Sequence, residues 1–319
     1  VISGSIIGPW KLRRLKPDLI FVYEPSPVTV GIPAVFIGKL KKVPVIFWAL
    51  DLWPETLQAV GGIKSKSVLW LIEKIVRFIY NNCVLVLGQS KSFVKSIQTH
   101  CDYPDRVKYF PSWAENLHDI KSLSKPIYAP EIKRNDECFN ILFAGNIADA
   151  QDMPAIVNAA SLLRDNMLIK WIIVGDGRRF EWLKSEIKKR KLEKNFLILG
   201  RFPLERMPSF FAHADALLVS LKKDPVFSLT IPAKLQTYLM TGIPIIGMLD
   251  GEGSKIIEES NSGISIPASD SSSLADAVKK MSMLSSKNLE QLGQNGITYS
   301  QKEFDRVMLM DRLENFFKS

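Results

Sequence analysis

Short apolar runs alternate with amphipathic segments along the first third of the chain. The runs predict strands at 16–23, 44–48, 84–87 and 107–110, and the segments between them predict helices at 27–39, 67–80 and 90–99. Continuous apolar strands are covered on both faces, and strands that alternate with helices are connected in parallel. The pattern therefore predicts an α/β domain with a parallel sheet.

A second and longer series of the same kind begins near residue 139. The predicted strands are 139–144, 169–174, 196–199, 216–219 and 244–248, and the predicted helices are 153–163, 180–190, 206–212, 232–240, 253–260, 271–281 and 286–295. A last helix at 301–317 carries apolar residues at helical spacing. This series predicts a complete doubly wound domain.

The two series predict two Rossmann-like domains in a chain of 319 residues. We expect a first domain at 1–114, a polar linker at 115–138 and a second domain at 139–300. The last helix, 301–319, is expected to join the first domain. Only about four strands are predicted in the first domain, whereas a full doubly wound domain has about six. We therefore expect the first strands of this domain to be missing from the sequence.

Charge is unevenly distributed along the chain. The formal net charge is +9, and residues 1–137 hold 19 Lys/Arg against 12 Asp/Glu, a net of +7. A basic half favours an anionic partner such as a lipid surface, a diphosphate-lipid or nucleic acid, although a solvated basic surface explains the same excess.

Composition narrows the classes of protein further. No apolar run reaches the ~18 residues of a membrane span. The three cysteines are isolated and the histidines form no metal-binding spacing, so we expect no disulfide framework and no metal site.

Two glycine turns directly follow predicted strands of the second domain. The first is Gly145-Asn146, and the second is Gly175-Asp176-Gly177-Arg178. In an open parallel sheet, ligands bind beyond the carboxyl ends of the strands, where glycine lets the backbone approach a phosphate. Arg178 has the guanidinium geometry that matches phosphate oxygens. Tight turns with a solvated arginine are the alternative for both segments.

A third turn, at 228–246, carries more information. Pro232 suits the first helical position, Gly242 suits the helix end, and Pro244 suits the start of the next strand. Lys234 then lies in the first turn of the helix, where it opposes the helix dipole. A local conflict of this kind is expected at an anion site, although a solvent-exposed lysine is the alternative.

The order of these motifs resembles the donor domain of family 4 retaining glycosyltransferases, which have the GT-B fold. The strand–GN–helix, strand–GDGxR–helix and strand–PxKxxxYLxxGxPII segments carry the resemblance, and so does Asp51-Leu52-Trp53-Pro54-Glu55 after the strand Val43–Trp48. Bacterial enzymes of O-antigen, capsule and colanic-acid-type polysaccharide synthesis are the most similar group. The resemblance implies two Rossmann-like domains facing a cleft, and metal-independent transfer with retention of configuration.

The resemblance also assigns roles to particular residues. It implies a nucleotide-sugar donor, with UDP or a similar nucleotide, as a substrate rather than a cofactor. The candidate donor-binding residues are Gly145, Asn146, Arg178, Lys222, Ser228, Thr230 and Lys234. This sequence departs from the family at the paired glutamates of the third turn, which Leu229 and Thr237 replace, and at the basic residues of the first turn, which Asn146 and Gln151 replace.

On the acceptor side, Asp51 and Glu55 are the candidate catalytic residues, since a carboxylate at a strand end can orient or deprotonate a hydroxyl. Glu24 and Trp53 are expected to lie at the same edge. Alternatively, Asp51 caps the turn that follows it and Trp53 packs locally.

The leading hypothesis is a transferase that acts on a lipid-linked saccharide at the cytoplasmic face of the cell membrane. The residues expected to dock on an anionic bilayer are Trp10, Lys11, Arg13, Arg14 and Lys16, together with Trp70, Phe78 and Tyr80. We expect no nucleic-acid partner. The missing glutamates leave open a catalytically silent, membrane-associated scaffold in a polysaccharide assembly. A dehydrogenase is disfavoured because no GxGxxG is present.

Overall fold

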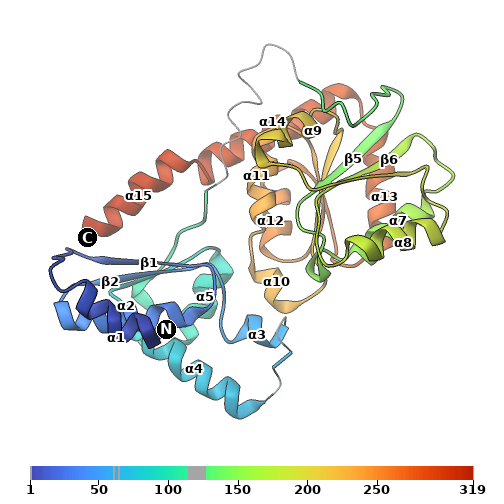
Figure 1. Ribbon diagram of the computed structural model, residues 1–319. Coiled ribbons are helices and arrows are strands. Elements are labelled where there is room, and N and C mark those ends of the chain that lie inside the picture. Colours follow the sequence, from blue (N-terminus) through green and yellow to red (C-terminus); the bar gives the residue numbers. More distant parts are fainter. Residues whose placement is uncertain (1, 60–61, 64, 114–126, 319) are drawn as a thin grey trace. The chain divides into compact units, whose positions relative to one another are not determined.

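The computed structural model describes residues 2–59, 62–63, 65–113 and 127–318, and it divides into two compact units (Figure 1). The first unit comprises the chain up to Ser112, the segment Asp224–Thr230 and the chain from Val307 onward. The second unit comprises Trp113–Lys223 and Ile231–Arg306. Of the predicted linker, residues 115–126 lie outside the described residues. Ala129 and Ile132, which follow them, are buried in a core of the second unit.

The first unit contains a parallel sheet of four strands in the order β1-β2-β3-β4. The strands are β1 (Ile20–Glu24), β2 (Val45–Ala49), β3 (Leu85–Gly88) and β4 (Val107–Tyr109). The helices of this unit are α1 (Ile2–Lys11), α2 (Gly31–Lys41), α3 (Glu55–Ala59), α4 (Lys66–Asn81), α5 (Lys91–Thr99), α10 (Pro225–Leu229) and nearly all of α15 (Arg306–Lys318).

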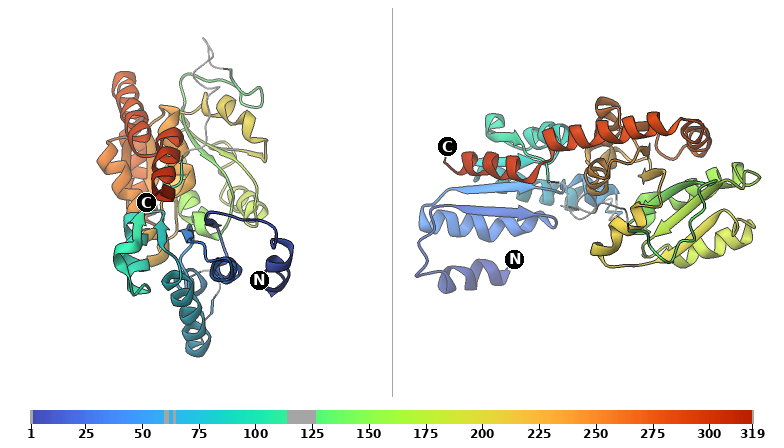
Figure 2. Two further views of the ribbon diagram at one scale, coloured as in Figure 1. Left: turned by 90° about the vertical axis from the view of Figure 1, so that its left-hand side faces the viewer. Right: turned by 90° about the horizontal axis from the view of Figure 1, so that it is seen from above.

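Both faces of this sheet are covered by apolar side chains. On one face, Phe47 of β2 is buried in a cluster with Ile79 of α4. On the other face, Phe21 and Phe110 contact Phe317 and Phe316 of α15, the red carboxyl-terminal helix in Figures 1 and 2. This double coverage explains why the strands have continuous rather than alternating apolar residues.

The second unit contains a parallel sheet of six strands in the order β10-β9-β8-β5-β6-β7. The strands are β5 (Phe139–Ala144), β6 (Ile169–Val174), β7 (Phe196–Gly200), β8 (Ala216–Ser220), β9 (Ile245–Met248) and β10 (Gly263–Ile266). The chain proceeds outward from β5 in one direction and then from β8 in the other. This reversal is the topological switch point at which doubly wound sheets bind ligands.

Seven helices of the second unit flank this sheet among the described residues. They are α7 (Met153–Leu162), α8 (Phe180–Lys189), α9 (Met207–Phe211), α11 (Ala233–Thr241), α12 (Glu252–Ser260), α13 (Ser271–Ser282) and α14 (Ser286–Glu303). Alternate residues of β5 enter two separate apolar cores, with Phe143 on one face and Leu142 on the other. None of the helices in the described ranges combines the length and the apolar composition that crossing a bilayer requires.

The structure corrects several predicted elements. Strand β10 was not predicted, because it is a short edge strand with two residues of low apolar character, Gly263 and Ser265. Helix α14 continues to Glu303, past its predicted end at 295. Glycine is typical of helix ends, and the helix was predicted to stop here. Gly293 and Gly296 instead lie inside the helix and allow it to pack closely on α11. The last helix therefore begins only at Arg306.

Candidate functional site

The loops that follow β5, β6 and β7 are joined by backbone hydrogen bonds at the carboxyl edge of the second sheet. The amide of Gly145 donates to the carbonyl of Val174 at 2.9 Å, and the amide of Gly175 donates to the carbonyl of Gly200 at 2.7 Å. The predicted glycine turns are therefore adjacent and form a single rigid edge.

Glycine is required where these two turns cross. Gly175 has a φ of +146°, and a Cβ atom there would overlap the carbonyl oxygen of Gly145. Gly177 has a φ of +156°, and a Cβ atom there would overlap Asn146 Oδ1 and the carbonyl of Ile147. Both positions exclude larger residues by conformation and by space.

A pocket of about 840 Å³ opens beside the glycine turns. The pocket is lined by the glycine turns, with Gly145, Asn146, Gly175 and Gly177, and by Arg201 and Phe202. Pockets of this size hold small organic ligands, and an aromatic wall suits a planar ring.

Helix α11 is attached to the end of β5 by Tyr238. The Tyr238 hydroxyl accepts a hydrogen bond from the amide of Ala144 at 2.9 Å and donates one to its carbonyl at 3.1 Å. Lys234 lies four residues before Tyr238 and therefore on the same helix face. Gly242 ends the helix with a φ of +76°, as predicted, whereas Pro232 is the N-cap rather than the first helical residue.

The Lys234 ammonium is buried beside the first glycine turn. Its Nζ lies 3.7 Å from the ring centroid of Phe143, and a Cβ atom on Gly145 would lie 3.2 Å from it. Among the residues that the structure describes, Nζ has no hydrogen-bond partner. Loss of hydration lowers the pKa of Lys234 from 10.5 to about 7. A buried ammonium with unused donors is costly unless an anion occupies the site.

A second group of basic residues lies along the outer part of the same edge. Arg179 Nε donates to Asp149 Oδ1 at 2.5 Å, and this hydrogen bond, together with the charges of Arg178 and Lys222, lowers the pKa of Asp149. The backbone amide of Lys222 donates to the carbonyl of Ala150 at 2.8 Å. The side chains of Arg178 and Lys222 are exposed at this edge. The outer part of the edge therefore carries excess positive charge.

The structure groups Ser228 and Thr230 with the first unit instead of with the glycine turns of the second unit. Both belong to α10 or its end. Ser228 Oγ donates to the carbonyl of Pro225 at 2.6 Å, and Thr230 Oγ1 donates to that of Val226 at 3.2 Å. Their hydroxyls therefore stabilise a short helix locally.

Asp51 accepts three hydrogen bonds in the turn after β2. Its Oδ1 accepts from the amide of Leu52 at 2.9 Å and from Thr56 Oγ1 at 2.6 Å. Its Oδ2 accepts from Trp53 Nε1 at 3.1 Å. Asp51 therefore caps the turn and orients the Trp53 indole.

Glu24 lies at the end of β1 and has no exposed surface. Burial raises its pKa to about 8, the negative charge of Asp51 adds to the rise, and the nearby amides of Leu50 and Asp51 partly oppose it. Neither carboxyl oxygen has a hydrogen-bond partner within the described parts of the chain. Burial therefore favours the protonated form of Glu24.

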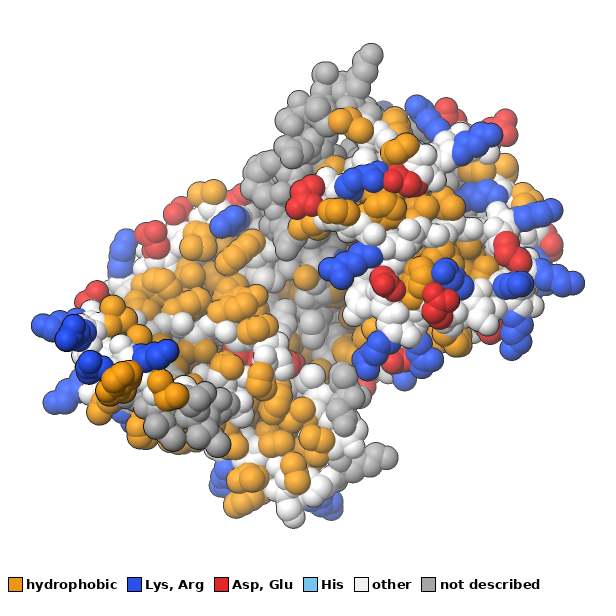
Figure 3. All heavy atoms as spheres, viewed as in Figure 1, with side chains coloured by type: hydrophobic (Ala, Val, Ile, Leu, Met, Phe, Trp, Pro, Cys, Tyr) orange, Lys and Arg blue, Asp and Glu red, His pale blue; other side chains and the backbone are white. Residues whose placement is uncertain are grey.

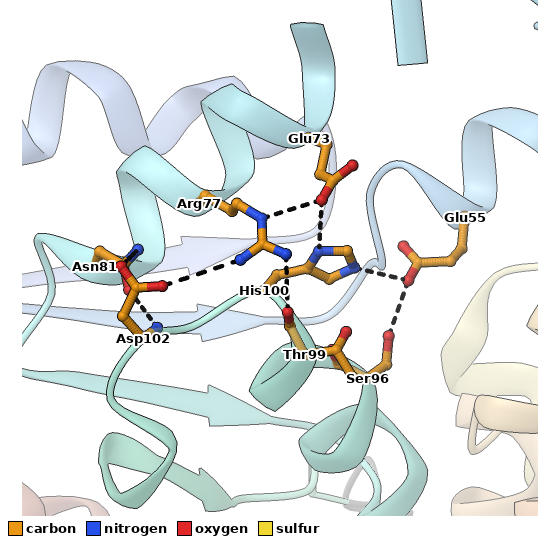
Figure 4. A network of polar contacts seen from close by, with 8 residues as sticks. All are labelled: Glu55, Glu73, Arg77, Asn81, Ser96, Thr99, His100 and Asp102. Atoms are coloured by element: carbon orange, nitrogen blue, oxygen red, sulfur yellow. Dashed lines mark hydrogen bonds and ion pairs between the residues drawn. The ribbon is translucent and has the colours of Figure 1, made fainter. Parts of the chain in front are cut away.

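Glu55 is the first residue of α3, and only one of its two carboxylate oxygens has a polar partner among the described residues. Its Oε1 accepts from Ser96 Oγ at 2.9 Å and lies 3.3 Å from His100 Nε2 (Figure 4). Oε2 is buried and has no partner in the described ranges. Burial acts to raise the pKa of Glu55, but the hydrogen bonds from His100, its own amide and Ser96 outweigh burial and lower it.

Four residues of these sites were not among the sequence candidates. Arg201 and Phe202 follow a predicted strand, so the rule that placed the other turns applies to them as well. Tyr238 could have been found from its spacing of four residues from Lys234, which puts both on one helix face. His100 had no signal, because only the folded chain brings it next to Glu55, 45 positions away.

Solved structures with this architecture show that the fold is GT-B. A structure of Anabaena Alr3699/HepE in complex with UDP matches with a TM-score of 0.78, covering 98% of this chain and 81% of that one at 13% identity. Sucrose-phosphate synthase from Thermosynechococcus elongatus matches with a TM-score of 0.73, covering 98% and 75% at 14% identity. At these identities the likeness concerns the fold alone.

Sequence comparison finds similarity to glycosyl transferases in the second unit. Residues 138–283 match the family model Glycosyl transferases group 1. WcaI of Escherichia coli K12, which is named as a colanic acid biosynthesis glycosyl transferase, is 28% identical over 72% of this chain and 57% of its own length. The 2-deoxystreptamine N-acetyl-D-glucosaminyltransferase of Niallia circulans is 26% identical over 44% of this chain and 35% of its own. The chain thus spans little more than half the length of WcaI.

Proposed function

We propose that this chain is a glycosyltransferase that moves a sugar from a nucleoside-diphosphate sugar to an acceptor. The observation that carries the proposal is the buried ammonium of Lys234, which has no hydrogen-bond partner among the described residues and lies beside two glycine turns and a pocket of about 840 Å³. A diphosphate would supply the negative counter-charge for this ammonium. A nucleoside would fit the pocket next to it. The family match of the second unit, and the UDP bound by HepE, support the same reading.

The donor site has separate parts for the two halves of the nucleotide. We assign the diphosphate to Lys234, to the backbone of Gly145 and to the amino end of α11, with Arg178 and Lys222 at the rim. We assign the base, as in UDP, to the wall formed by Phe202. Positive groups fixed in place before the reaction stabilise the charge of the leaving diphosphate, so the proposal requires no metal ion.

The acceptor is proposed to be a lipid-linked saccharide of cell-surface polysaccharide synthesis, bound by the first unit. The name of WcaI supports this class of pathway. Asp51 and Glu55 supply carboxylate oxygens near one sheet edge, Trp53 donates to Asp51, and the charge of Asp51 acts on Glu24 at the end of β1. Retention of anomeric configuration is part of the proposal.

The transfer reaction is tested by incubating the chain with UDP-glucose, UDP-N-acetylglucosamine and related donors, with a bacterial lipid extract and EDTA. We expect release of UDP from one donor, and a product whose anomeric NMR coupling matches that of the donor. If a donor binds but no sugar is transferred under any condition, the chain fits the catalytically silent scaffold instead.

The first unit also has the surface that we propose contacts an anionic membrane at the cytoplasmic face. Trp10, Leu40 and Trp70 are 64%, 62% and 60% exposed. They belong to α1, α2 and α4, of which α2 packs against both α1 and α4. Figure 3 shows basic side chains beside hydrophobic ones over this unit. Aromatic side chains interleaved with cations suit the bilayer interface.

One residue expected at that surface does not belong to it. Tyr80 is 1% exposed and is buried in the core of the first unit. It lies on the inward face of α4, whereas Trp70 and Phe78 are on the outward face. Its ring packs against Phe47 instead.

The double substitution Trp10→Ser and Trp70→Ser is expected to weaken binding to vesicles rich in anionic lipid about tenfold, since each indole contributes interfacial contact area. Co-sedimentation measures this. Met283→Ser, which alters an 81% exposed side chain of the second unit, is the control and should bind as wild type does. Equal binding by the double variant and the control would remove the membrane part of the proposal.

A further inference from the structure

We propose that Glu55 is the carboxylate that accepts a hydrogen bond from the acceptor hydroxyl, and that His100 is the positioning residue that holds it. This inference rests on the proposed function, because it selects one residue among the three acidic candidates of the first unit. Selection is possible because Glu24, Asp51 and Glu55 differ in how many of their oxygens are already used.

Asp51 and Glu24 are less suited than Glu55 to accept a hydrogen bond from a substrate hydroxyl. Both oxygens of Asp51 accept hydrogen bonds within its own turn, from the Leu52 amide, Thr56 and Trp53. A hydroxyl bound to either oxygen would share it with a hydrogen bond that already orients the turn. Glu24 is fully buried. Burial favours its neutral form, which is a weaker acceptor than a carboxylate.

Glu55 has one occupied oxygen and one unoccupied oxygen. Its Oε1 has two partners, Ser96 Oγ at 2.9 Å and His100 Nε2 at 3.3 Å. A carboxylate can only accept hydrogen bonds, so Nε2 carries the proton of this contact. Two partners on Oε1 fix the plane of the carboxylate. Among the described residues, Oε2 is the oxygen of this carboxylate that has no hydrogen-bond partner, and such a buried atom calls for one.

Side chains of helix α4 lie next to His100, as Figure 4 shows, although His100 Nδ1 has no hydrogen-bond partner among the described residues. Its Nδ1 lies 3.8 Å from Glu73 Oε1, and the same oxygen accepts from Arg77 Nε at 3.0 Å. Arg77 also donates to the carbonyl of Thr99 at 3.0 Å and lies 4.0 Å from Asp102. The imidazole is only 15% exposed. The contacts thus run continuously from α4 through His100 to Glu55.

The contact with His100 also sets the charge of Glu55. Burial favours the neutral acid, and the hydrogen bonds from His100 and Ser96 favour the carboxylate and lower the pKa of Glu55. The other charged or titratable groups around this cluster are Glu24, Asp51, Glu73, Arg77, Tyr80 and Asp102. If the imidazole is removed, the hydrogen bond that most strongly lowers the pKa of Glu55 is lost. The effect of burial then raises this pKa.

The test compares His100→Ala and His100→Gln with His213→Gln, a control in the second unit whose imidazole contacts the carbonyl of Ala129. The ¹³C NMR shift of the Glu55 carboxyl group is followed against pH, which requires no turnover. We expect the Glu55 titration to move to higher pH in His100→Ala, to move less in His100→Gln, whose amide can still donate, and to stay unchanged in the control. An unchanged titration in both His100 variants overturns the positioning role.

The contact with the acceptor is tested by kinetics on the same chain. Glu55→Gln is expected to lower kcat about 100-fold with the KM for donor unchanged. The acid limb of the rate profile should move to higher pH in His100→Ala. Wild-type kcat in Glu55→Gln overturns the assignment. Absence of transfer by the wild type refutes the proposed function, and the NMR titration still decides whether His100 holds Glu55.

Discussion

Replacing Lys234 with methionine is expected to stabilise the folded chain and to remove nucleotide binding. The substitution keeps most of the length of the side chain and deletes an ammonium that has no hydrogen-bond partner in the described structure. Exchanging buried charge for apolar volume commonly adds about 1–4 kcal/mol to the free energy of unfolding. The affinity for UDP should fall about 100-fold, because the diphosphate loses its buried counter-charge.

The gain in stability should depend on pH in a defined direction. The pKa of Lys234 is about 7 in the folded chain, against 10.5 for an ordinary lysine. Between these two values the unfolded state binds more protons than the folded state, so wild-type stability rises with pH across this window. The advantage of Lys234→Met is therefore largest below pH 7 and fades toward pH 10.5. Urea unfolding at several pH values measures it.

Lys188→Met is the matched control for this experiment, because Lys188 is an exposed lysine of α8 in the same unit. Its free energy of unfolding should stay within about 0.5 kcal/mol of wild type, and its affinity for UDP should be unchanged. If Lys234→Met binds UDP as tightly as this control does, Lys234 does not contact the diphosphate.

Gly175→Ala is expected to cost about 3 kcal/mol or more of the free energy of unfolding. The residue has a φ of +146°, which alanine rarely adopts, and its Cβ atom would overlap the carbonyl oxygen of Gly145. Since that oxygen belongs to the backbone of the adjacent turn, the two turns must move apart. Nucleotide affinity should fall as well, even at temperatures where the variant remains folded.

Gly200→Ala separates the free-energy cost of a positive φ from the cost of steric overlap. Gly200 also has a positive φ, +78°, but an added Cβ atom would have nothing within 4 Å. Its substitution should cost only about 1 kcal/mol, the penalty for left-handed backbone. Urea midpoints of the two variants measure the difference. Equal losses would mean that the turns after β5 and β6 are not in tight contact.

The sequence predicted the parts of the fold that depend on local pattern. Strands β5 and β6 appear as continuous apolar runs because both of their faces are buried. Gly242 was recognised as a helix end because only glycine adopts its backbone conformation at no cost. Strand β10 was missed because its residues are only partly buried and lack a long apolar run.

The sequence was less informative where function depends on contacts between distant residues. It selected Lys234 from a local conflict with the helix dipole, and the structure adds why its ammonium is buried, through the bond between Tyr238 and Ala144. It also selected Glu55 and Asp51 together. Only the fold separates them, because His100 and Ser96 reach Glu55 from a different helix, 45 and 41 positions away.

The central claim is that the second unit binds a nucleoside diphosphate through the charge of Lys234. The most direct measurement is calorimetric titration of the chain with UDP, UMP and uridine at pH 7 in EDTA. The account predicts that affinity falls in that order, with a loss at each removed phosphate and without need of a metal ion. Equal affinity for all three, or no binding of UDP by a folded chain, would contradict it.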